Sequence, residues 1–341
     1  MKRSLTLFAC GVALIYSAPI ALSHHSVSNF DMQNQVTLKA TVTEFSFRNP
    51  HIYFKVQGND AAGVEHEYLI EGHSVTGLKR RGWTQDTLQK GDEITLYGAP
   101  DKDPNKHFIF LNYLVDADGK KFISQGGGSE ETTTITPSTD FSGTWDLDRR
   151  TFNIRDAGGP PPKDWPYTAE AQKLVDSFSY DENPELECLE IGVPRIVLYP
   201  YAINFSRKND HIYVHKEHVN EKRQIWLYEE DSIAENAPSR PVGSSFVTYE
   251  SPRKLVIQTH KFTPTKWGIA NGVNSSAQKQ LEETYLLSED GMSIDISFKI
   301  TDPANLEEPV IRTMRLLKAA DREFEEFECD TRAASRHLEI K

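Results

Sequence analysis

Alternation of apolar and polar residues dominates the chain after residue 35 and predicts a mostly β protein. The clearest case is the run 36–47, in which every second residue from Val36 to Val42 is apolar. A period of two places such side chains on one face of a strand. Further β-rich runs lie at 52–56, 66–71, 93–98 and 108–115, and the spacing in 74–82 predicts one short helix. Five strands with a helix between the third and fourth match the order of an OB-like five-stranded barrel.

A second and longer series of short apolar runs begins at residue 143. It predicts strands at 143–147, 195–199, 202–207, 212–217, 224–228, 245–250, 254–260, 282–287, 293–300 and 311–318. Turn-forming residues at 208–210 and 290–291 favour hairpins between neighbours. Ten or so antiparallel strands at this spacing predict a larger lipocalin-like barrel or a two-sheet sandwich. One helix, 169–178, follows the N-cap residue Thr168, and its apolar face (Ala171, Leu174, Val175 and Phe178) is expected to pack on the core.

The two series are separated by a stretch with little to bury. Residues 124–139 are rich in Ser, Gly and Thr and show no periodicity, which is typical of a linker. We therefore expect an OB-like domain at 24–123, a linker at 124–139, a β-barrel domain at 140–331 and a C-terminal tail at 332–341.

The N-terminal 23 residues have the pattern of a cleavable signal peptide. Lys2 and Arg3 precede an apolar stretch, and the small residues Ala21 and Ser23 stand three and one positions before a cut at His24. No later apolar run is long enough to cross a bilayer. The sequence thus predicts a periplasmic or secreted protein with no membrane span after signal cleavage.

Charge and cysteine content narrow the possible functions. The chain has a net charge of −12 at pH 7, so binding to the phosphate backbone of nucleic acids is disfavoured. Signal cleavage would remove Cys10 and leave only Cys188 and Cys329. In an oxidising compartment these two are expected to form one disulfide, the alternative being two buried free thiols.

Several motifs resemble those of an exported bacterial family of unknown function, domain of unknown function 6152. They are His24-His25-Ser26, Phe30-Asp31, Asn49-Pro50-His51, Gly82-Trp83 and Lys90-Gly91-Asp92 in the first domain. Motifs around Cys188, Gly192-Val193-Pro194-Arg195 and Thr301-Asp302-Pro303 resemble the C-terminal domain that accompanies the family. The resemblance implies no established activity.

The most suggestive group of metal ligands is the predicted new N-terminus. Cleavage before His24 would give one residue both a free α-amine and an imidazole, a pair that chelates copper(II) when one more imidazole joins it. His51, at the corner after Asn49-Pro50, is the expected third ligand, His25 is a second option, and His66 and His73 could contribute. The alternative is that His24 and His25 are simply a solvated start of the chain.

A second cluster lies in the larger domain. Tyr213, His215 and Glu217 alternate along one predicted strand and, with Trp226, could line a ligand pocket inside a barrel, although a solvated strand face is the commoner arrangement. The chain contains no nucleophile elbow, phosphate loop, dinucleotide fingerprint or His-Glu-x-x-His motif.

Three hypotheses follow for the function of the protein. The leading one is an extracytoplasmic binding protein with a copper site at the mature N-terminus. The first alternative is a metal-free β-barrel that binds a small apolar or carbohydrate-like ligand, or a protein partner. The second, a copper-dependent oxidative enzyme, would need an open coordination position and a substrate surface that the sequence does not reveal.

Overall fold

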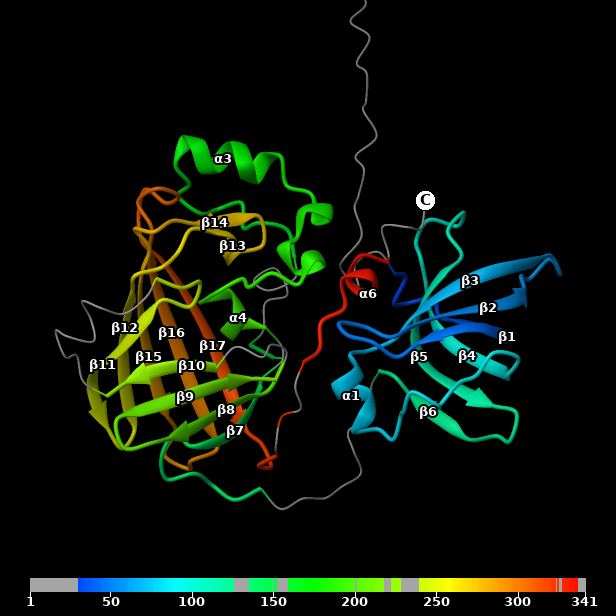
Figure 1. Cartoon of the computed structure of the whole chain (residues 1–341), viewed down its shortest axis with the longest axis horizontal. Helices are drawn as coiled ribbons and strands as arrows, with labels where there is room; N and C mark the ends of the chain where they lie inside the picture. The colour runs from blue at the N-terminus through cyan, green and yellow to red at the C-terminus, as the bar shows by residue number, and fades with distance from the viewer. Residues whose placement is uncertain are drawn as a thin grey trace, which may run out of the picture.

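The computed structural model describes residues 30–125, 135–148, 150–151, 159–199, 201–217, 222–227, 239–322, 324 and 327–336. Within them the protein is mostly β and forms two closed barrels, as predicted (Figure 1). The predicted signal peptide, most of the linker and the last residues of the tail lie outside this part of the chain.

The N-terminal barrel has the predicted OB topology. Its elements are β1 (Val36–Ser46), β2 (Tyr53–Asn59), β3 (Glu65–Glu71), α1 (Val75–Lys79), β4 (Glu93–Pro100), β5 (Phe108–Asp116) and β6 (Lys121–Ile123). The strand order is β3-β2-β1-β4-β5, and a parallel pairing of β3 with β5 closes the barrel. Helix α1 stands between β3 and β4, begins at the N-cap Ser74, and is shorter than the predicted 74–82. Alternate residues such as Leu38, Val42 and Phe54 fill the interior.

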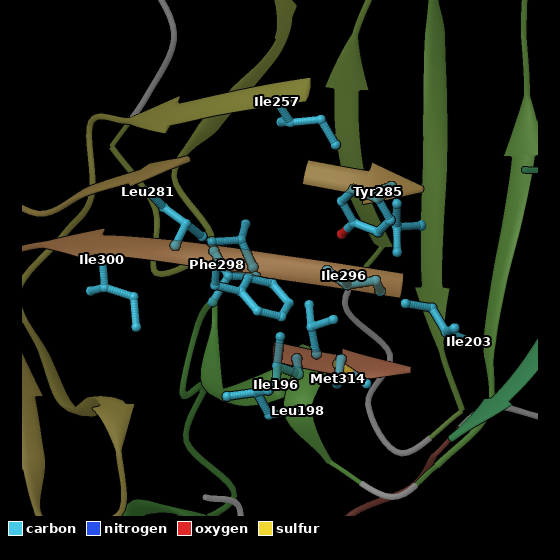
Figure 2. Close-up of a cluster of buried hydrophobic side chains, with 14 of the residues drawn as sticks. Ile196, Leu198, Ile203, Ile257, Leu281, Tyr285, Ile296, Phe298, Ile300 and Met314 are labelled. Carbon is cyan, nitrogen blue, oxygen red and sulfur yellow. The ribbon is translucent and has the colours of Figure 1, made fainter. Parts of the chain in front are cut away.

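The C-terminal domain closes into a nine-stranded barrel rather than a sandwich. Its strands are β7 (Gly143–Leu147), β8 (Ile203–Arg207), β9 (His211–Lys216), β10 (Lys222–Trp226), β11 (Ser244–Ser251), β12 (Lys254–His260), β15 (Gln280–Leu287), β16 (Ser293–Thr301) and β17 (Val310–Lys318). All neighbours are antiparallel except β10 and β11. Figure 2 shows side chains of β8, β12, β15, β16 and β17 filling the interior.

One end of this barrel is covered by the two long connections. The connection from β7 to β8 carries α3 (Ala169–Asp176), η2 (Tyr180–Glu182), η3 (Pro184–Glu187) and α4 (Arg195–Leu198). The connection from β12 to β15 carries the hairpin of β13 (Thr265–Ala270) and β14 (Val273–Ser275), which lies with α3 over this end (Figure 1). Ile196 and Leu198 of α4 belong to the barrel core (Figure 2).

Two details of the predicted secondary structure are wrong. The run 195–199 is helix α4 and not a strand. It is buried on every side, so it has no alternation by which a sequence distinguishes a short strand from a short helix. The predicted packing face of α3 is only partly right, because Ala171 is buried and Val175 packs against the core but Leu174 is 49% exposed.

The predicted disulfide is confirmed. Cys188, which follows η3, is bonded to Cys329, with their Cα atoms 5.9 Å apart and a sequence separation of 141. Cys329 also forms a parallel β-bridge with Asn49 of the OB barrel. Helix α6 (Thr331–Ser335) follows and lies between the two barrels, with Ala333 and Ala334 buried (Figure 1). The segment in which we expected a tail to begin therefore starts as a packed helix.

Candidate metal site

His51 stands at a tightly held corner between β1 and β2. It follows Asn49 and Pro50, whose peptide bond is cis. The Asn49 side chain is buried, and its Oδ1 accepts a hydrogen bond from the backbone N–H of Val75 at the start of α1, at 3.2 Å. The backbone O of Asn49 accepts a bond from the N–H of Asp330. The corner is thus fixed both to its own barrel and to the C-terminal segment.

The contacts of the His51 ring define its tautomer. Nδ1 lies 3.2 Å from the carbonyl oxygen of Gly72 and 3.7 Å from Oε1 of Glu71. A carbonyl oxygen can only accept, so Nδ1 is the donor and the lone pair of the neutral ring is on Nε2. A ring whose Nδ1–H points at a carbonyl or carboxylate is the arrangement typical of metal-binding histidines.

Glu71 is an acid at the side of His51 whose side chain is only 14% exposed. It lies directly opposite Tyr53 in the pairing of β2 with β3, and the two side chains are hydrogen-bonded. Burial raises the pKa of Glu71 to about 8, and burial together with Glu71 raises the pKa of Tyr53. A carboxyl group in this state is protonated at neutral pH. Because an added positive charge nearby favours the ionised form, Glu71 can supply a negative charge when a cation binds.

The N-terminal arm joins the OB barrel on the face that carries Glu71. Phe30 forms a β-bridge with Asp101, and the N–H of Asp31 donates to the O of Pro100 at 2.8 Å. The Phe30 ring lies 4.9 Å from that of Phe108, and Tyr53 belongs to the same buried cluster. The first described residue of the chain is therefore anchored in the buried cluster that also contains Tyr53, the hydrogen-bond partner of Glu71.

Two other histidines of the N-terminal domain, His66 and His73, have local contacts. His66 stacks on His107 with ring centroids 4.1 Å apart, and its Nε2 is 3.1 Å from Asp60. His73 Nδ1 is 2.8 Å from the backbone N of Ser74. Within the described ranges, no three His, Cys, Asp or Glu side chains are grouped as metal ligands. His24 and His25 lie outside those ranges. Of the predicted copper ligands His24, His51 and His25, the structure therefore describes His51.

The cluster predicted to line a pocket inside the larger barrel does not face its interior. In β9 the inward side chains are Ile212 and Val214, whereas Tyr213 and His215 are half-buried on the outer face. Trp226 is on the same outer face, because it pairs with His211 across the β9–β10 ladder. The alternation along β9 was predicted correctly. The prediction was wrong about which face of the strand points into the barrel.

Glu217 is separated from these three residues. It follows the end of β9, is buried, and makes ion pairs with Arg80 of α1's C-cap and with Arg322 after β17. Since Arg80 belongs to the OB domain, Glu217 connects the two domains. Its role in the structure is an interdomain contact and not part of a pocket lining.

Sequence reasoning missed the polar centre of the larger barrel. Arg223 of β10 donates to both carboxylate oxygens of Glu283 on β15, one bond being 3.0 Å long, and also to Ser245 and Thr259. The Tyr285 hydroxyl donates to the same carboxylate at 3.1 Å. One sequence signal could have found this pair. Arg223 and Glu283 each stand in register with the apolar residues of their strands, Ile225 on β10 and Leu281 on β15.

Comparison with known families concerns the domain that carries His51. Residues 13–110 match the model of the family of unknown function DUF6152. The match confirms the resemblance drawn from the His-His-Ser and Asn-Pro-His motifs, both of which it covers. The motifs of the second domain lie outside the matched residues. No curated protein matches the chain, and no helix in the described ranges is long and apolar enough to span a membrane.

Proposed function

We propose that this protein is an extracytoplasmic binding protein that holds copper(II) between its mature N-terminus and His51. Signal cleavage before His24 would create an amine and an imidazole on one residue. With His51 they make three nitrogen ligands, a set that suits the tetragonal preference of copper(II). His25 is the alternative donor from the arm.

The observation that carries the proposal is the anchoring of Phe30. It is packed on the same face of the OB barrel as Tyr53, which is hydrogen-bonded to Glu71, and Glu71 lies beside His51. Only five residues lie between His24 and this anchor, and the six steps from one to the other give an extended reach of about 20 Å. The proposal therefore requires the His51 ring to lie within that reach of Phe30.

The surroundings of His51 suit a metal ligand. The Nδ1 contact with Gly72 leaves the lone pair on Nε2, and Glu71 stands close enough to orient the ring and offset part of the ion's charge. Glu71 would lose its proton as the ion binds, because its pKa of about 8 falls when a cation is near. Copper affinity should therefore rise with pH as protons leave the ligands and Glu71.

Titration calorimetry with copper(II) tests this proposal on protein purified from its native export route. We expect His51→Ala and a one-residue extension before His24 each to weaken binding at least tenfold, because each removes one nitrogen from the chelate. His260→Ala, in the larger barrel, is the control and should bind like wild type. Equal affinity in all four proteins would refute the site.

A further inference from the structure

The two ends of the larger barrel differ in how they are covered. The end at which β7 stops and β8 starts is covered by α3, α4 and the β13–β14 hairpin (Figure 1). At the opposite end, where β8 and β11 stop, lies a cavity of about 490 Å³. This volume is within the range of small-molecule sites, roughly 300–1,000 Å³. We call this end the barrel mouth.

The floor of the mouth cavity is apolar. It is formed by Phe141, Phe205 and Ile212, all of which belong to the buried core of the barrel. Phe205 packs edge-on against Tyr285, with ring centroids 5.8 Å apart. Tyr285 in turn donates to Glu283 in the polar centre. A molecule in the mouth would therefore rest on aromatic rings that are themselves held in place.

An ion pair crosses the rim of this cavity. Arg207 at the end of β8 donates through both terminal nitrogens to the carboxylate of Glu250 on β11, one of the bonds being 3.3 Å long. Strands β9 and β10 stand between β8 and β11 in the barrel, so the pair is not a contact between adjacent strands. Both residues line the cavity. We call the pair the latch, because a molecule that enters the cavity from this side would have to pass it.

We propose that the barrel mouth binds a small uncharged, largely apolar molecule, with the Arg207–Glu250 pair as its latch. The apolar floor favours a ring or a short hydrocarbon chain because burying such surface is favourable. Among the described residues that line the cavity, Glu250 and Asp140 stand against one cation, Arg207, so an anionic ligand would meet net negative charge. This site shares no residue with the copper site, and either can be correct without the other.

Fluorescence titration of the full mature protein tests the mouth with two probes. N-phenyl-1-naphthylamine is uncharged and should bind saturably at one site per chain. The anionic 1-anilinonaphthalene-8-sulfonate should bind at least tenfold more weakly. Ser142→Trp should reduce the affinity for the uncharged probe at least tenfold, because Ser142 lines the cavity and the indole would fill it. Ser142→Leu is a smaller replacement for use if the Trp variant does not fold.

The latch is tested by kinetics. Arg207→Ala should speed association of the uncharged probe about threefold or more, since entry no longer requires the pair to break. Arg315→Ala is the matched control, because it removes an ion pair of similar exposure, with Asp295 on the outer wall, and should leave the rate unchanged. Unsaturable binding, equal affinity in the Ser142 variants or equal rates in Arg207→Ala would overturn the proposal.

Discussion

Each barrel contains a glutamate with little or no exposed surface, and the two are held in opposite ways. Glu283 in the larger barrel is contacted by Arg223 through both guanidinium ends and by Tyr285. Glu71 in the OB barrel has a tyrosine and a histidine as its polar neighbours, and burial raises its pKa to about 8. Glu283 is structural, because its carboxylate oxygens are already occupied by a cation. Glu71 is neutral and stands beside an imidazole, so it can ionise when a positive charge arrives.

The comparison also separates what a single sequence can and cannot predict. The OB strand order, the hairpins and His51 at its corner were predictable, because alternation and turn residues are local signals. Glu71 was not singled out, because it meets Tyr53 only through the register of β2 with β3. Arg223 and Glu283 are 60 residues apart, and the sequence does not show that their strands bring the two side chains together inside one barrel. Which face of a strand points inward is decided only when the barrel closes. For the same reason Tyr213 and His215 were wrongly assigned to the interior.

Removing the disulfide is expected to have the largest effect. The bond closes a loop of more than 140 residues, so Cys188→Ser with Cys329→Ser should lower the free energy of unfolding by about 4–5 kcal/mol in the chain-entropy model. Since Cys329 bridges Asn49, the loss should reach the His51 corner as well. Hydrogen exchange should show faster opening at Asp330 and at the β1–β2 corner. Unchanged exchange there would mean that the bond does not support the corner.

Removing the cation of the larger barrel should have the next largest effect. Arg223→Ala leaves the carboxylate of Glu283 buried without its partner, and we expect a loss of about 3–5 kcal/mol in denaturant unfolding. Arg223→Met combined with Glu283→Leu should recover much of that loss, because no charge is left unpaired. If the double variant is as unstable as the single one, packing rather than charge explains the effect.

Glu71 should give a smaller effect with a defined pH dependence. Its folded pKa of about 8 lies above its ordinary value of 4.5, so its contribution to stability is complete below about pH 4.5 and is lost as pH rises through 8. Wild type should therefore lose stability progressively between pH 5 and pH 9 from this group. Glu71→Gln, which mimics the protonated acid, should lack this slope in urea unfolding curves measured across that range. A wild-type slope that survives in Glu71→Gln would assign it to other groups.

The most direct test of the copper site is an electron paramagnetic resonance spectrum of the protein with one equivalent of copper(II). Protein that begins at His24 should give hyperfine splitting from three nitrogen ligands, and His51→Ala should lose one of them. Labelling the histidine rings alone with ¹⁵N should change the splitting from two nitrogens and leave that of the terminal amine. A spectrum with the same ligands in wild type and His51→Ala would contradict the account, because His51 would then not bind the metal.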